Sequence, residues 1–133
     1  MKATSLSAGI AINAVLTEGL GKSVTRVTPV ISTEDATMPF VVYRRTELEG
    51  TASKQGRSFD TCAIELRVYT KTYGEGITIA ERIRELLEYK NITCKESVDG
   101  IDLRMDCGRM VACDEGWDND SYVQSMTLEC KIV

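Results

Sequence analysis

Apolar residues recur at helical spacing in two segments of the chain. The first runs from Leu6 to Leu20, where Ser5 is a candidate N-cap and Gly21 follows the end. The second runs from Glu75 to Tyr89, and its apolar stripe is built from Ile79, Ile83, Leu86 and Leu87. The pattern therefore predicts two helices, separated by a stretch with a different period.

Between these helices, alternating and β-branched residues predict three strands. Val24 to Ile31 reads as an edge or bent strand, because Pro29 has no backbone N–H to donate to a sheet. Phe40 to Leu48 and Ser58 to Thr70 follow, and the polar segment from Gly50 to Arg57 joins them. We expect these last two strands to form a long hairpin with a polar tip.

The C-terminal third alternates again and predicts a second group of strands. Ile92 to Val98 and Ile101 to Cys107 flank Asp99-Gly100, which is the signal of a two-residue hairpin turn. Met110 to Cys113 continues as a strand or bulge, and Tyr122 to Ile132 forms the final strand. Between them, the carboxylate-rich segment from Asp114 to Ser121 is expected to be an acidic loop that holds Trp117.

The order of these elements indicates the fold class. Strands do not alternate regularly with helices, so a doubly wound parallel sheet is not expected. We predict an α+β fold, with a mostly antiparallel sheet and two helices packed on one face as a two-layer sandwich. The 133 residues fit a single domain that spans residues 1–133, and no internal repeat is visible.

Composition and charge exclude several classes of partner. The formal net charge of -4 does not suit nucleic-acid binding, which needs clustered lysine and arginine, so no sequence-specific nucleic acid is expected. No apolar run approaches the ~20 residues that span a bilayer, and no signal peptide is recognised, so no membrane contact is expected. The five cysteines are an odd number without a secretory signal, which favours reduced and mostly buried thiols.

The residues of catalysis and metal binding are missing or badly spaced. The chain has no histidine, so Ser-His-Asp and Cys-His arrangements cannot form within it. Gly21-Lys22-Ser23 lacks the upstream glycine of a phosphate-binding loop. Cys107 and Cys113 are too far apart for a zinc pair, and the acidic segment does not match a calcium loop. We therefore expect no enzyme activity, no cofactor and no metal.

Two groups of residues are candidates for contacts with other proteins. Arg44, Arg45, Lys54 and Arg57 form a basic cluster on the predicted hairpin. Such a cluster can protect a sheet edge from unwanted pairing, or it can contact an acidic neighbouring subunit. Trp117 is either a solvated aromatic in an acidic turn or an anchor in an interface.

Several short motifs then resemble one family, in order as well as in sequence. Met38-Pro39-Phe40-Val41-Val42-Tyr43 is similar to the P-[YF]-V-V-[YF] entry to the second strand in the small tail-completion proteins of long-tailed phages. The strand-to-helix passage and the last loop and strand of that family are matched by Ala63 to Tyr69, Thr72 to Glu75, Ile79 to Leu87 and Trp117 to Leu128. The resemblance covers most of the chain, although Gly76 or Ile77 stands where the family commonly has alanine.

The resemblance implies a structural role, with no enzyme activity and no cofactor. Members of that family are ring-forming tail-terminator or head-to-tail joining proteins, commonly hexamers, at the junction of tail tube and head. The implied partners are further copies of the chain, the tail tube protein and the head–tail connector proteins. The implied location is the virion, after synthesis in the cytoplasm of a bacterial host. Two alternatives stay open, namely another phage neck or adaptor protein and a bacterial module that binds a small ligand.

Overall fold

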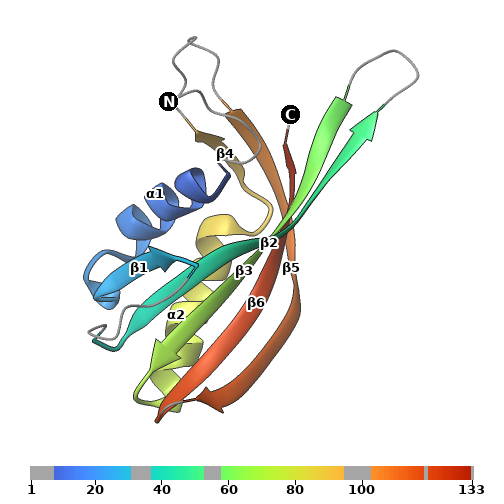
Figure 1. The fold of residues 1–133 in the computed structure, drawn as a ribbon. Coiled ribbons are helices and arrows are strands. Elements are labelled where there is room, and N and C mark those ends of the chain that lie inside the picture. Colours follow the sequence, from blue (N-terminus) through green and yellow to red (C-terminus); the bar gives the residue numbers. More distant parts are fainter. Residues whose placement is uncertain (1–7, 31–36, 53–57, 95–102, 119, 133) are drawn as a thin grey trace.

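The computed structural model describes residues 8–30, 37–52, 58–94, 103–118 and 120–132 of the chain. Within these residues, the fold has two helices and six strands, with one short 3-10 turn after the first helix (Figure 1). In chain order they are α1 (Ala8–Leu20), η2 (Gly21–Ser23), β1 (Arg26–Pro29), β2 (Phe40–Ala52), β3 (Ser58–Thr70), α2 (Tyr73–Leu87), β4 (Asn91–Cys94), β5 (Leu103–Asp118) and β6 (Ser121–Ile132).

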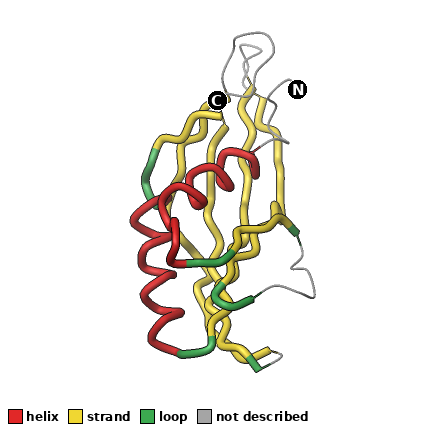
Figure 2. The backbone as a smooth tube through the Cα atoms, turned by 90° about the vertical axis from the view of Figure 1, so that its left-hand side faces the viewer, coloured by secondary structure: helices red, strands yellow, loops and turns green. Residues whose placement is uncertain are grey.

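All six strands belong to one sheet, in the order β1-β2-β3-β6-β5-β4. Both helices lie on the same side of this sheet, so the fold is α+β (Figure 2). The sheet matches only in part the mostly antiparallel, two-layer arrangement that the sequence predicted. β1 pairs with β2 in parallel, whereas the other neighbours pair antiparallel, and the mixed sheet curls instead of lying flat under the helices.

The core lies between the helices and the sheet. Alternate residues of β3 point toward the helices, and Ile64, Leu66 and Val68 are completely buried there. Ile12 from α1 and Ile83 from α2 pack into the same cluster. This burial follows the two periods that the sequence shows, one of 3.6 residues in the helices and one of two residues in the strands.

A polar contact ties α1 to the parallel edge of the sheet. The Asn13 side chain donates one hydrogen bond to the Val27 carbonyl at 3.3 Å and another to the Tyr43 hydroxyl at 3.1 Å. Both of these partners lie near the junction of β1 and β2. Because Asn13 satisfies groups from both strands, it fixes the helix over the one parallel pair of the sheet.

The start of α2 lies two residues before the predicted one. Thr72 is extended and serves as the N-cap, with its hydroxyl accepting a hydrogen bond from the Glu75 N–H at 3.4 Å. The prediction began the helix at Glu75, with Gly74 and Gly76, which are poor helix formers, bracketing the entry. The cap outweighs that propensity, since it satisfies one of the N–H groups left unpaired at a helix start.

Replacing Thr72 with alanine should therefore lower stability by about 1 kcal/mol, because the cap hydroxyl is lost. Denaturant unfolding followed by circular dichroism measures this change. Thr72→Ser is the matched control, since serine keeps the hydroxyl, and it should stay close to the parent. Equal loss in both variants would mean that the methyl group of Thr72, and not the cap, supplies the stability.

The acidic segment predicted as a loop is instead the end of a strand. β5 continues to Asp118 and pairs with β6 from Asp114↔Ser125 to Asp118↔Ser121. Two bulges interrupt the register before this point, and Ala112 has a positive φ of 49°. Bulges break the period of two that marks a strand in sequence, so this end of β5 could not be recognised by alternation.

Other predicted boundaries hold or move slightly. Gly21 ends α1 with a φ of 51°, and the strand that contains Pro29 is an edge strand, both as predicted. β2 runs on to Ala52, so it is longer than predicted. The candidate cap Ser5 and the turn Asp99-Gly100 lie outside the described residues.

Candidate interaction surfaces

Glu65, in the middle of β3, holds two arginines on the face of the sheet away from the helices. Its Oε1 lies 3.5 Å from Arg44 Nε and 3.1 Å from Arg67 Nε. Both arginines are about half exposed, and ion pairs of this kind contribute little to stability. Arg44 was predicted from sequence as an interface residue, but Arg67 was not, because only the strand register brings it to the same carboxylate.

Arg44 and Arg45, two residues of the predicted basic cluster, do not lie on one surface. Arg44 pairs with Glu65 in the register, whereas Arg45 pairs with Ile64, whose side chain points toward the helices. Successive residues of a strand point to opposite faces, so the two arginines are separated by the sheet. Lys54 and Arg57 lie outside the described residues.

Around Arg44 and Arg67, the face of the sheet that lies away from the helices is partly apolar. The Phe40 ring stacks on the Tyr69 ring with centroids 4.8 Å apart, and Phe40 and Val42 are nearly buried. A shallow recess of about 490 Å³ lies here, and its lining includes Val30, Val42, Arg44, Glu65, Arg67 and Tyr69. This face is therefore a mixed apolar and charged surface.

A second surface gathers three exposed aromatic side chains, and we call Tyr73, Trp117 and Tyr122 the aromatic surface. The Tyr122 ring touches both others edge-on, at centroid distances of 5.0 Å to Trp117 and 5.8 Å to Tyr73. Trp117 is 60% exposed and Tyr73 45%. Large aromatic side chains exposed together are enriched in protein interfaces and are uncommon elsewhere on a surface.

Three elements build the aromatic surface. Trp117 and Tyr122 are directly opposite each other at the ends of β5 and β6, and Tyr73 is the first residue of α2. Gly76 allows this end of α2 to approach the sheet, since a Cβ there would lie 3.0 Å from Thr70 Oγ1. The surface lies at the opposite end of the molecule from the hairpin ends of β2 and β3 (Figure 1).

Glu115 supplies a fixed negative charge beside these rings. Its carboxylate accepts hydrogen bonds from the Tyr73 hydroxyl at 2.8 Å and from Gln124 Nε2 at 3.0 Å. The bond from Gln124, and then the bond from Tyr73, lower the pKa of Glu115. The same hydrogen bond to Glu115 raises the pKa of the Tyr73 hydroxyl. The aromatic surface therefore carries an ionised carboxylate at neutral pH.

Glu115→Gln should lower the pKa of the Tyr73 hydroxyl toward the ordinary value for tyrosine, because the hydrogen bond to the carboxylate is lost and glutamine has no charge to oppose the phenolate. Carbon-13 NMR of tyrosines labelled at Cζ measures each hydroxyl separately. Tyr43 is the control, since burial is the main cause of its raised pKa and the substitution is remote from it. An unchanged pKa for Tyr73 would contradict the contact with Glu115.

Sequence reasoning found one member of the aromatic surface and missed two. Trp117 was predicted as a possible anchor, although in a loop and not at the end of a strand. Tyr73 and Tyr122 were assigned to a helix entry and a strand without an interface role. The available signal was the spacing of Trp117 and Tyr122 around Asp118 to Ser121, which fits a tight hairpin that sets the two rings opposite each other.

Neither a metal-binding group nor a membrane-spanning helix is found in the part of the chain that the structure describes. There, no group of three or more cysteine or acidic side chains is arranged to hold a metal ion. In the same residues, no helix is both long enough and apolar enough to cross a bilayer. Of the thiols described, Cys62, Cys107 and Cys130 are buried as predicted, and Cys113 is exposed.

Comparison with known proteins adds one finding about the fold. No protein-family model matches the chain, and neither does any curated protein. Among solved structures, the chain is similar to one from the virion of a native gene transfer agent particle, with a TM-score of 0.68 and 11% sequence identity. The match covers 98% of both chains, so the two share a fold along their whole length.

Proposed function

We propose that this chain is a structural protein of a phage-like virion. The observation that carries the proposal is the fold shared with a chain of a gene transfer agent virion, over 98% of both chains. At 11% identity this likeness concerns the fold alone, and function is inferred from it by analogy. The family resemblance of the strand and helix motifs supports the same assignment independently.

Within such a particle, the role we propose is that of a tail-terminator or tail-completion subunit. Copies of the chain form a ring, a hexamer by the family resemblance, at the junction of tail and head. The ring contacts the tail tube protein on one side and the head–tail connector proteins on the other. The chain is made in the cytoplasm of the bacterial host and acts without catalysis, which agrees with the absence of histidine.

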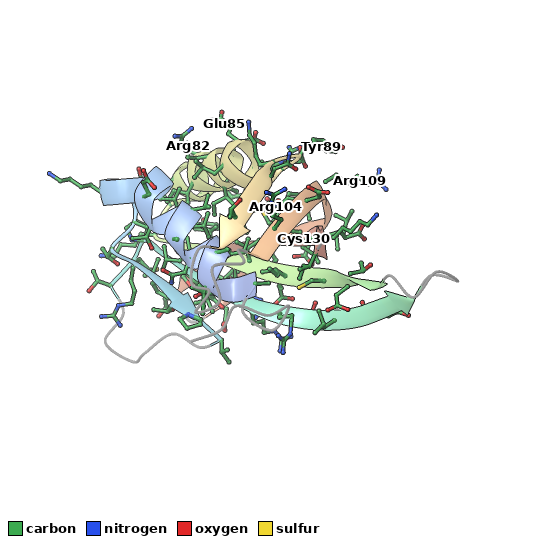
Figure 3. All side chains as sticks on the ribbon, turned by 90° about the horizontal axis from the view of Figure 1, so that it is seen from above. Arg82, Glu85, Tyr89, Arg104, Arg109 and Cys130 are labelled. Carbon is green, nitrogen blue, oxygen red and sulfur yellow. The ribbon has the colours of Figure 1, made fainter. Side chains whose placement is uncertain are left out.

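The positions of the aromatic surface and of the far ends of β2 and β3 suit an assembly of this kind. The aromatic surface lies at the opposite end of the molecule from the ends of β2 and β3 at Ala52 and Ser58 (Figure 1). Contacts between unlike ends are heterologous, and such contacts generate closed rings when the rotation between copies permits. On α2, Arg82 pairs with Glu85 at 3.0 Å, and both side chains point away from the sheet (Figure 3).

Deleting the gene in the phage or prophage that carries it tests the proposal. We expect electron microscopy of the mutant lysate to show separate heads and tails, with few joined particles. Expressing the parent chain from a plasmid should restore joined particles. Normal yields of complete particles from the deletion strain would overturn the proposed role, and a defect confined to head filling would point to a different neck protein.

A further inference from the structure

Three buried thiols lie side by side across the centre of the sheet. In the strand register, Cys130 of β6 stands directly opposite Cys62 of β3 on one side and opposite Cys107 of β5 on the other. The Cys130 thiol points to Cys107, with the two sulfur atoms 3.6 Å apart. Figure 3 labels Cys130, which lies inside the molecule near β5.

The backbone determines how closely Cys107 and Cys130 approach. The Cys107 N–H donates to the Lys90 carbonyl at 2.9 Å, on the side of β5 that faces away from β6. Cys107 and Cys130 are therefore a non-hydrogen-bonded pair, and such pairs have Cα atoms about 4.5 Å apart. Disulfides span Cα distances of about 4.4–6.8 Å, so this backbone can accept the bond.

The neighbouring pair, Cys62 and Cys130, is less suited to forming a disulfide. Because residues of a strand direct their N–H and C=O groups to one side, Cys130 directs its backbone groups toward β3. Cys130 and Cys62 are therefore a hydrogen-bonded pair, with Cα atoms about 5.5 Å apart and side chains farther from each other. The close contact that the structure gives Cys130 is to Cys107 and not to Cys62.

We propose that Cys107 and Cys130 are a site of covalent modification, a dithiol in the reducing cytoplasm that becomes a disulfide in the presence of a peroxide. The Cys107 sulfur attacks one peroxide oxygen, the O–O bond breaks, and water leaves with the formation of a sulfenic acid. The Cys130 sulfur then displaces the hydroxyl group from Cys107 as a second water. Two thiols and one hydrogen peroxide thus give one disulfide and two waters.

The environment of the pair determines which sulfur reacts first. The hydrogen bond from the Cys130 thiol lowers the pKa of Cys107 and raises that of Cys130. Cys107 is also the more accessible of the two, and it adjoins the bulge in β5 that precedes Met110. The thiolate is the nucleophile in this chemistry, so Cys107 attacks and Cys130 resolves.

The bond would join two neighbouring strands and close a loop of the chain. Cross-links of this kind stabilise a protein mainly by restricting its unfolded state. A virion protein leaves the reducing cytoplasm when the particle is released, and this consequence rests on the proposed function. Formation of the disulfide does not depend on the proposed function, so experiments on the purified full-length chain test the disulfide separately.

The experiment treats purified Cys113→Ser protein with hydrogen peroxide, since Cys113 is exposed and could link two molecules. We expect the intact mass to fall by two hydrogens and non-reducing peptide mapping to find Cys107 joined to Cys130. The thermal midpoint of unfolding should rise by roughly 5–15 °C, as expected when a disulfide closes the loop between Cys107 and Cys130, which are 23 positions apart.

Two further variants make the test specific. Cys62→Ala in the same background should still form the bond, and Cys130→Ala should lose both the mass change and the rise in midpoint. A link between Cys62 and Cys130 would overturn the proposal. It would also fail if the thiols of folded protein stay reduced, or oxidise to sulfinic acid without cross-linking.

Discussion

Phage carrying Trp117→Ala together with Tyr122→Ala should produce mostly unjoined heads and tails, although the variant protein folds. Both rings are exposed, so removing them leaves the core intact. The double substitution removes two of the three side chains that form the aromatic surface. Aromatic anchors at the centre of an interface each contribute about 2 kcal/mol or more, and 2 kcal/mol corresponds to roughly 30-fold weaker association. The yield of joined particles, counted by electron microscopy, measures the effect.

Tyr89→Ala is the matched control for this prediction. Tyr89 is also an exposed aromatic residue, at 71%, but it follows α2 and lies away from the aromatic surface. The control should give particles at the parental yield. If the double variant, shown by circular dichroism to be folded, also gave parental yields, the aromatic surface would not be a subunit contact.

Leu66→Ala should destabilise the protein by about 2–5 kcal/mol, the cost of emptying a buried leucine site. Leu66 is completely buried in the centre of β3, where it packs in the main core cluster between sheet and helices. Domains have only about 5–15 kcal/mol of stability in total, so this loss can leave a large unfolded fraction. Urea unfolding followed by Trp117 fluorescence or circular dichroism measures the loss.

Two milder variants keep that prediction testable if Leu66→Ala does not fold. Ile64→Val removes one methylene from the same face of β3 and should cost about 0.5–1.5 kcal/mol. Ile77→Ala changes a residue of α2 that is 40% exposed, and it should cost much less than Leu66→Ala. A loss at Ile77 as large as at Leu66 would mean that the core is placed wrongly.

The sequence predicts the parts of this fold that have a regular period. Both helices and β3 follow from the spacing of their apolar residues, and β2 follows from its apolar start at Phe40 to Tyr43. The parallel pairing of β1 could not be predicted. Parallel neighbours usually need a crossover of a dozen or more residues, whereas only residues 30–39 separate β1 from β2.

The interaction surfaces were harder to predict than the fold, because they depend on register. Arg44 and Arg45 are adjacent in sequence, yet they lie on opposite faces of β2. Tyr73 is remote from Trp117 in sequence, yet both contact Tyr122. A sequence displays neighbours along the chain, and a surface is made by neighbours across strands, so only Trp117 was identified in advance as part of the aromatic surface.

Locating the chain in purified particles tests the central claim of the account most directly. Gold-labelled antibody against the folded protein should mark one site on each particle, at the junction of tail and head. Image reconstruction of that site should reveal a closed ring into which the fold of α1, α2 and the six-stranded sheet can be fitted. Absence of the chain from purified particles, or labelling along the tube or at the distal tail tip, would contradict it.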